Sequence, residues 1–280
     1  MEHKMNVVEQ SGLTLRSGGN QDGFSMRMNN VFSHPDGKAL VLGIDHTLFD
    51  GFISGLDDIP GLFSQLPLDS VDAVLASPVT YRRARMGTLP KKLGKVMRID
   101  TTDAFNPGSA RNVLAATVAS EAEIVRSGVD AVTCFFLVNG EGTRIGDYSS
   151  HVAEISRMCR NYGYPLFVEA LCVDDNGGTI GDTKLILYAA RMASELGADV
   201  LKIDAPSDRR DLKDIVSAMD RPVLIRGGTP KDDRVGMLRE VEGFIEAGAA
   251  GIVFGRTVFQ AKDPGGMMRD LYKALHGQGY

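Results

Sequence analysis

Short apolar runs alternate with longer amphipathic stretches along most of this 280-residue chain. The apolar runs have the length of buried strands, and eight of them follow one another. They occupy residues 39–45, 71–77, 95–100, 130–137, 165–171, 199–204, 222–226 and 250–254. Helical spacing is clearest between some of them, over residues 113–125, 152–159, 185–196 and 235–247.

A glycine stands between each of these helical stretches and the next strand, at Gly128, Gly163, Gly197 and Gly248. Glycine supplies the left-handed conformation that ends a helix. Strands joined through helices make right-handed parallel units, and eight such units close into a barrel. We therefore predict an α/β protein with a single (β/α)8 TIM barrel over residues 27–280.

Two features bear on the organisation of the chain. Residues 1–26 are rich in glycine, serine and asparagine and show no period, which predicts an N-terminal arm or a cover for one barrel end. A doubly wound open sheet is the main alternative fold. Two observations favour the barrel over this sheet: an open sheet does not need eight strand–helix units, and no GxGxxG turn follows the first strand.

Composition excludes several classes of function. The chain has 31 basic and 36 acidic residues, and the basic ones are scattered, so we expect no nucleic-acid partner. Its apolar runs are far shorter than the roughly 20 residues that cross a bilayer, which favours a cytoplasmic protein without a membrane partner. The number of cysteines is odd, and no two of Cys134, Cys159 and Cys172 have the spacing of metal ligands. We therefore expect reduced, buried thiols, no metal and no cofactor.

Polar residues stand at the ends of the otherwise apolar strands. In a barrel of this type the active site lies at the carboxyl ends of the strands. Polar side chains are costly as core filler, so we expect these residues to line a pocket. They are Asp45, His46, Arg98, Asp100, Glu169, Lys202, Asp204, Arg226 and Arg256.

Lys202 is the most informative of these residues. It lies in the apolar strand 199–204, where desolvation disfavours its ammonium form and frees the amine to attack a carbonyl. The strand period of two places Asp204 on the same inward face, with Val200 deeper as filler. The alternative is a lysine at a strand end whose charge reaches solvent.

Two glycine-containing turns follow the last two strands, at Arg226-Gly227-Gly228 and at Gly255-Arg256. In phosphate-binding barrels these loops offer backbone N–H groups to an anion, and an arginine adds a charge-assisted clamp. The pair predicts a phosphate site, with ordinary turns and a solvated arginine as the alternative.

As a set, these motifs resemble the class I (Schiff-base) aldolases. The group includes deoxyribose-phosphate aldolase, archaeal-type fructose-bisphosphate aldolase, tagatose-bisphosphate aldolase and the autoinducer-2 phosphate thiolase. The resemblance covers about residues 27–276, and residues 27–38 look like the helix and turn that precede the first strand in this group.

The resemblance implies roles for individual residues. Lys202 matches the Schiff-base lysine, and Asp45 matches the acid that assists proton transfer or contacts substrate hydroxyls. The phosphate cradle matches Gly227, Gly228, Gly255 and Arg256.

The sequence departs from the archaeal-type pattern at two places. The tyrosine acid/base at the end of strand five is absent, because those positions read Leu171 to Asp174. Glu169, two residues earlier, is similar to the strand-five glutamate of the tagatose-bisphosphate aldolases. Thr47 stands after His46, where glycine is usual.

These observations favour an aldehyde-lyase of carbohydrate metabolism that acts on a phosphorylated keto sugar. Glu169, among apolar strand neighbours, is expected to have a raised pKa and to alternate between acid and base, with Asp45 as the alternative base. Glu169 is otherwise a carboxylate paired with Lys202 or Arg98.

Further residues have two interpretations each. Arg98 and Asp100 either bind the distal end of the substrate or pair with each other. His46 is interpreted as a supporting residue of the substrate site rather than a catalyst. Tyr81, Arg82 and Arg83 either reach a second phosphate or belong to a solvated helix face.

Two other functions stay open. One is a thiolase-type acyltransferase that transfers an acetyl group from a phosphorylated diketone to coenzyme A, and the other is a non-catalytic phosphosugar-binding barrel. Barrels of the group assemble into homo-oligomers, so the resemblance also implies self-association.

Overall fold

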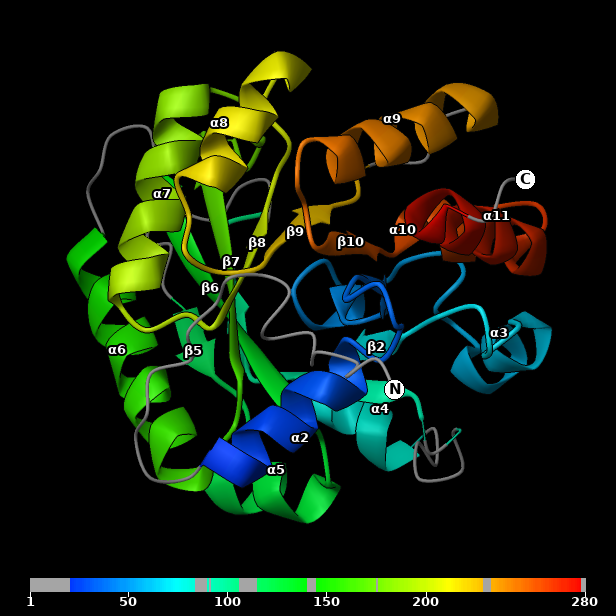
Figure 1. The fold of residues 1–280 in the computed structure, drawn as a ribbon. Helices are drawn as coiled ribbons and strands as arrows, with labels where there is room; N and C mark the ends of the chain where they lie inside the picture. Colours follow the sequence, from blue (N-terminus) through cyan, green and yellow to red (C-terminus); the bar gives the residue numbers. More distant parts are fainter. Residues whose placement is uncertain are drawn as a thin grey trace, which may run out of the picture.

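The computed structural model describes residues 21–83, 90, 92–105, 115–139, 145–174, 176–228 and 233–277. Eight parallel strands close into a barrel in the order β1-β10-β9-β8-β7-β6-β3-β2, which confirms the predicted (β/α)8 fold (Figure 1). The strands are β1 Ala39–Gly43, β2 Ala73–Ala76, β3 Gly94–Arg98, β6 Ala131–Asn139, β7 Leu166–Val173, β8 Val200–Ile203, β9 Val223–Arg226 and β10 Gly251–Phe254.

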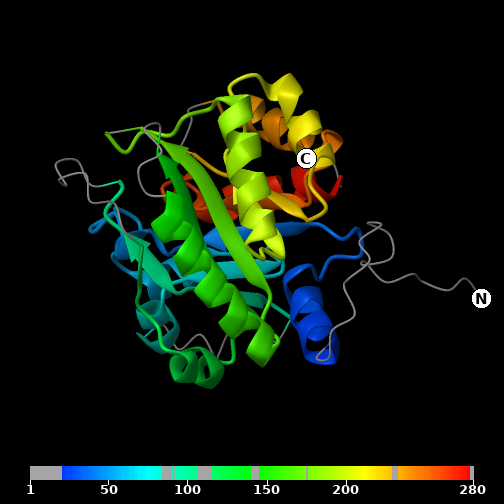
Figure 2. The same cartoon turned by 90° about the vertical axis from the view of Figure 1, so that its left-hand side faces the viewer.

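Helices surround this barrel. Figure 2 shows α6 and α7 side by side over the outer face of β6 and β7. The α-helices are α2 Gln21–Val31, α3 Ile59–Gln65, α4 Pro78–Arg83, α5 Glu121–Ser127, α6 Ile145–Tyr162, α7 Thr183–Glu195, α8 Leu212–Ser217, α9 Arg234–Glu246, α10 Arg256–Phe259 and α11 Pro264–His276, with 3-10 helices η1 His46–Leu48 and η3 Arg209–Asp211. Among the described residues, no helix is both long and apolar enough to cross a membrane.

The glycines expected to end helices do so. Gly128, Gly163, Gly197 and Gly248 all have positive φ, between 65° and 107°. Because this backbone region is costly for residues with a Cβ, the glycines let the chain turn sharply from each helix into the next strand.

The expected helix over residues 113–125 is wrong in its first half. Ala115–Thr117 forms β5, which pairs antiparallel with β4, Asp100–Thr102, outside the barrel. The helix α5 begins only at Glu121, after Ser120 and Glu123 form a reciprocal capping box. The cap sets the start of this helix more strongly than the apolar spacing before it.

The expected boundary of the N-terminal arm at residue 26 falls inside a helix. The α2 helix already begins at Gln21 and packs against β3 and β6 at the amino end of the barrel. Phe32, just after it, is buried with its ring centroid 6.4 Å from that of Phe167. Residues 1–20 of the expected arm lie outside the described residues.

The barrel interior is layered by the strand period of two. Its apolar layer includes Val96, Phe167, Val200 and Leu224, which form a cluster separate from the larger core between sheet and helices. Two residues further along the same strands, the inward positions become polar. This second layer contains Arg98, Glu169, Lys202 and Arg226, so the predicted site lies directly above the interior core.

Candidate active site

A pocket of about 490 Å³ opens at the carboxyl ends of the barrel strands. Nearly all of the site residues predicted from the sequence line it: Asp45, His46, Glu169, Lys202, Asp204, Arg226, Gly227, Gly228, Gly255 and Arg256. The barrel closure therefore brings together residues that lie more than 200 positions apart in the chain. Arg98 and Asp100 are the exceptions among the predicted residues, since neither lines the pocket.

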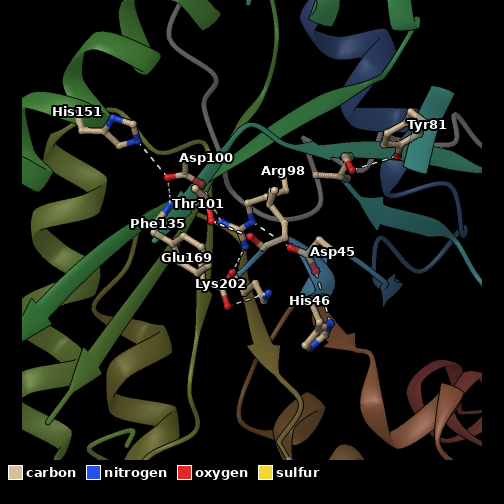
Figure 3. Close-up of polar contacts among 12 residues, drawn as sticks. Asp45, His46, Tyr81, Arg98, Asp100, Thr101, Phe135, His151, Glu169 and Lys202 are labelled. Carbon is tan, nitrogen blue, oxygen red and sulfur yellow. Dashed lines mark hydrogen bonds and ion pairs between the residues drawn. The ribbon is translucent and has the colours of Figure 1, made fainter. Parts of the chain in front are cut away.

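Lys202 points into the pocket from β8. Its side chain is only 8% exposed, and its Nζ lies 2.9 Å from Oε1 of Glu169 (Figure 3). The two residues face each other in the strand register between β7 and β8. Burial lowers the pKa of Lys202 below its ordinary value, although the charges of Glu169 and Asp45 oppose this shift. The position therefore favours a neutral amine more than a surface site would.

Glu169 does not have the raised pKa expected from its apolar strand neighbours. Burial alone would raise it, but the charges of Lys202 and Arg98 outweigh burial and lower the pKa to about 2. Beside these two cations Glu169 is held as a carboxylate, and the expected raised pKa is corrected. The interpretation as a carboxylate paired with Lys202 and Arg98 describes the geometry.

Arg98 lies beneath the pocket and is fully buried. Its Nε donates to Oδ2 of Asp45 at 3.0 Å, its Nη1 lies 3.4 Å from Oδ1 of Asp100, and its Nη2 donates to Oε2 of Glu169 (Figure 3). Burial disfavours the guanidinium charge, but the three carboxylates more than offset it and raise the pKa. The expected contact of Arg98 with substrate is therefore corrected, and its pairing with Asp100 is part of a wider network.

This network extends from the pocket toward the outside of the barrel. Oδ2 of Asp100 accepts a hydrogen bond from the Phe135 N–H at 2.8 Å and lies 3.0 Å from Nε2 of His151 on α6. The Arg98 guanidinium carbon lies 3.8 Å from the centroid of the Phe135 ring. The buried guanidinium of Arg98 is thus paired with carboxylates and packed against an aromatic ring, as a buried charge requires.

Asp45 and His46 come one residue after the end of β1. Asp45 is 1% exposed and lines the pocket, and its Oδ1 lies 3.8 Å from Nδ1 of His46. Burial lowers the pKa of His46 to about 4, against the opposing charge of Asp45, so the imidazole is neutral at pH 7. Its Nδ1 is buried and makes no hydrogen bond within the described part of the chain.

Asp204 contacts Arg226 rather than Lys202. Nε and Nη2 of Arg226 donate to the two carboxylate oxygens of Asp204 at 2.7 and 3.1 Å. This bidentate geometry fixes the guanidinium at the pocket rim.

Glycine is present at three positions of the last two loops, and the structural reason differs from one position to the next. A Cβ on Gly227 would lie 2.6 Å from the Phe254 ring, and one on Gly255 would lie 2.4 Å from the Gly43 carbonyl oxygen. Only Gly228 would place a Cβ in open space. Close packing therefore explains Gly227 and Gly255 even without an anion, and Gly228 leaves the backbone accessible to one.

Arg256 follows Gly255 and opens the short helix α10. Its side chain lines the pocket, and its buried Nε has no hydrogen-bond partner within the described ranges. A buried guanidinium N–H without a partner is costly, which a bound anion would relieve.

Several lining residues were not predicted from the sequence. They are Gly43, Phe49, Asp50, Ile53, Phe105, Phe135, Gly177, Thr179 and Val253. The strand period would have found Phe135, because it lies opposite Glu169 in the register between β6 and β7. Most of the others come from loops whose path no local pattern predicts.

Of the residues after β2 with a predicted role, Tyr81 and Arg82 do not line the described pocket. The Tyr81 hydroxyl is buried 3.0 Å from the carbonyl oxygens of Val74 and Val96, and Arg82 pairs with Glu123 at the surface. The expectation of a second phosphate site is corrected for these two residues. The Arg83 side chain lies outside the described residues.

No cysteine lines this pocket within the described residues. Cys134, Cys159 and Cys172 are buried free thiols, as predicted. Within the described residues, one group has metal-ligand spacing, His34, Asp36 and His276. It lies at the amino end of the barrel, where both ring nitrogens of His276 already contact carboxylates.

A closed barrel with a buried lysine at its sixth strand defines the class of protein to which this chain is similar, the class I aldolases. Residues 39–261 match the family model described as DeoC/LacD family aldolase. The chain belongs to the DeoC/LacD aldolase family.

Relatives and solved structures agree with this assignment. An uncharacterized aldolase of Saccharolobus solfataricus is 28% identical over 91% of this chain and 94% of its own length. The 2-amino-3,7-dideoxy-D-threo-hept-6-ulosonate synthase of Halobacterium salinarum is 29% identical over 91% and 92%. The crystal structure of an archaeal fructose 1,6-bisphosphate aldolase superposes with a TM-score of 0.76 at 25% identity, over 91% of this chain and 99% of that one.

A second structure bears on the chemistry. A fructose-1,6-bisphosphate aldolase described as Schiff base forming superposes with a TM-score of 0.75 at 25% identity, over 90% of this chain and 99% of that one. Together with the family match, it identifies this chain as a class I, aldolase-type enzyme.

Proposed function

We propose that this enzyme cleaves or forms a carbon–carbon bond in a phosphorylated keto substrate, and that Lys202 forms the Schiff base. One observation carries the proposal. The Lys202 amine is buried in the pocket with a lowered pKa, between an ionised Glu169 and the loops after β9 and β10. A neutral amine can attack the ketone carbon of the substrate, and a neighbouring anion site can bind its phosphate.

The covalent step begins when the neutral amine of Lys202 adds to the ketone carbon. Loss of the carbonyl oxygen as water leaves an iminium, whose positive charge attracts electrons. Glu169 is already within 2.9 Å of Nζ, so its carboxylate stabilises this cation. The charges of Lys202 and Arg98 lower its pKa and favour its ionised form, so we assign it this electrostatic role instead of proton transfer.

Bond cleavage needs a base for the hydroxyl proton of the substrate. Asp45 is the better candidate, because Arg98 contacts only its Oδ2 and leaves Oδ1 toward the pocket and His46. The O–H proton passes to Asp45, the electrons form the aldehyde carbonyl, and the carbon–carbon bond pair moves into the iminium to give an enamine. Protonation of the enamine carbon and addition of water release the ketone and regenerate the amine.

The loops after β9 and β10 supply the proposed phosphate site. Gly228 offers accessible backbone, Arg256 has an unpartnered buried Nε, and Arg226 is held at the rim by Asp204. A phosphate here would anchor the ketone end of the substrate near Lys202.

The thiolase-type acyltransferase is the second candidate, because no tyrosine lines the pocket within the described residues. Cleavage of ketose phosphates, measured with and without coenzyme A, separates the two functions. An aldolase turns over without coenzyme A, whereas the acyltransferase requires it. Lys202→Met should abolish aldolase turnover, and Lys184→Met, on the exposed face of α7, should not.

A result against the aldolase proposal would be turnover that depends on coenzyme A. Wild-type cleavage activity that persists in Lys202→Met would equally refute the assigned role of this lysine. A barrel that only binds phosphosugars would show no turnover in either variant or in the wild type.

A further inference from the structure

Three phenylalanines form one wall of the pocket. Phe49 follows η1, Phe105 follows β4 and Phe135 lies on β6. Their ring centroids lie 5.3 Å apart for Phe49 and Phe135, 5.9 Å for Phe49 and Phe105, and 5.8 Å for Phe105 and Phe135. We call these three residues the phenylalanine wall.

Two members of the phenylalanine wall, Phe105 and Phe135, lie across the barrel from the proposed phosphate loops, and Phe49 extends the wall toward β1, the neighbour of β10. In the closed strand order, β6 stands four places from β10, and β3, which leads into β4, stands four places from β9. Lys202 on β8 lies between the two sides. A substrate anchored by a phosphate at β9 and β10 and by a carbonyl at Lys202 would therefore extend its other end toward the wall.

The wall is held in place from behind. The Arg98 guanidinium stacks on Phe135 at 3.8 Å, which fixes this buried ring. Gly177, with a φ of 79°, lies so close to the loop after β4 that a Cβ would be 2.6 Å from the Ala104 carbonyl oxygen and 3.1 Å from the Phe105 Cα. The turn after β7 thus supports the backbone of Phe105.

Charge is distributed unevenly around the pocket. Among the described lining residues, the lysine and the arginines belong to β8, β9 and α10, as Lys202, Arg226 and Arg256. The lining acids Glu169 and Asp204 are paired with Lys202 and Arg226 on that side, and the segment after β1, which carries Phe49, contributes the acids Asp45 and Asp50. A second phosphate beside the wall would lose hydration against aromatic rings and face these carboxylates.

We infer that the phenylalanine wall receives the aldehyde half of the substrate, and that this half is uncharged and apolar. The substrate is then a keto monophosphate rather than a bisphosphate. This inference rests on the proposed function, since Lys202 and the phosphate loops determine which half of the substrate meets the wall.

In the synthetic direction, the wall positions the acceptor for attack. The enamine on Lys202 supplies the electron pair for the new carbon–carbon bond to the aldehyde carbon. The aldehyde oxygen takes a proton as it becomes a hydroxyl, and water then hydrolyses the iminium. An apolar aldehyde side chain gains affinity from burial against the rings, at about 25 cal/mol per Å² of apolar surface.

The test uses dihydroxyacetone phosphate as donor and compares butanal with glyceraldehyde 3-phosphate as acceptors. We expect kcat/KM to be at least about tenfold higher for butanal, the ratio that about 1.4 kcal/mol produces. Phe105→Arg adds a cation to the wall, and it should reverse the preference. The matched control is Phe52→Arg, because Phe52 is 84% exposed on the neighbouring loop and should leave the ratio unchanged.

The opposite ranking in the wild type would overturn the inference, whether or not Phe105→Arg folds. An unchanged ratio in a folded Phe105→Arg enzyme would also contradict it. Borohydride trapping with dihydroxyacetone phosphate alone tests the proposed function separately. Trapping together with a preference for glyceraldehyde 3-phosphate refutes only the wall's role, whereas absence of trapping refutes the proposed function and this inference with it.

Discussion

At the scale of single residues, the charge of each group is determined by neighbours on other strands. Glu169 and Lys202 face each other across the β7–β8 register, and Arg98 reaches Glu169 from β3. The result is a carboxylate with a pKa of about 2 beside a lysine whose pKa is lowered. Such a pair holds the amine in position and also makes its reactivity depend on the surrounding charges.

Replacing Glu169 with Gln tests this coupling. The negative charge of Glu169 raises the pKa of Lys202, so its removal should move the rise of imine formation with pH to lower pH. Loss of a charge-assisted hydrogen bond costs about 1.5–3 kcal/mol, so turnover should fall roughly 10- to 100-fold. The measurement is the pH profile of borohydride trapping, with the exposed Glu154→Gln on α6 as control. A lower rate with an unshifted profile would contradict the electrostatic role.

At the scale of elements, much of the barrel and its site was predictable from local pattern. The strands are short apolar runs, and the helices end at glycines. The proposed catalytic residues, such as Asp45 and Lys202, stand at or near the carboxyl ends of strands. The β4–β5 hairpin was missed because its three-residue strands carry too little periodicity. Phe49 and Phe105 were missed because long-range packing, as between Gly177 and Ala104, determines the path of their loops.

Arg98 links several elements at once, since its partners come from β4, β7 and the end of β1. Arg98→Met would leave three buried carboxylates without their shared cation. We expect the free energy of unfolding in urea to fall by about 3–5 kcal/mol. As a control, Arg191→Met removes an exposed pair with Glu195 and should cost no more than about 1 kcal/mol. Equal losses in the two variants would show that the buried network adds no stability.

The closure of the barrel depends on Gly251 at the start of β10. Its φ is 145°, and a Cβ there would lie 2.1 Å from the Ala39 carbonyl oxygen of the paired strand β1. Gly251→Ala should destabilise the fold by at least about 1–3 kcal/mol through backbone strain alone. Gly146→Ala in α6, where nothing lies within 4 Å of the added Cβ, should be neutral or slightly stabilising. Chemical denaturation of both variants measures the change in the free energy of unfolding. A Gly251→Ala protein as stable as the wild type would argue against this closure geometry.

At the scale of the whole molecule, one histidine joins the two ends of the barrel domain. His276, the last residue of α11, has its Nδ1 2.8 Å from Asp36 and its Nε2 3.2 Å from Asp72. Asp36 lies before β1 and Asp72 before β2, so the contact ties the C-terminal helix to the start of the barrel. Burial opposes the charged imidazole, but the two carboxylates outweigh it and raise the pKa of His276 above its ordinary value of 6.5.

The sign of this shift predicts how stability changes with pH. Because the folded-state pKa is raised, the stabilisation is fully present below pH 6.5 and is lost as pH rises through the folded-state value. His276→Gln should therefore lower the free energy of unfolding by about 1–3 kcal/mol at pH 6 and by less at pH 10. Urea denaturation of both proteins at the two pH values measures the difference. A cost that does not depend on pH would mean that His276 acts only by packing.

Self-association belongs to the same scale and stays a prediction from the family resemblance. The barrel described above places all of the proposed catalytic residues on one chain. We therefore expect assembly to affect stability more than the chemistry of the pocket.

The most direct test of the whole account is borohydride reduction of the enzyme with a phosphorylated ketone, followed by peptide mass mapping. We expect one covalent adduct on the peptide that contains Lys202, and no adduct in Lys202→Met. An adduct on a different lysine, or an equal adduct in Lys202→Met, would contradict it.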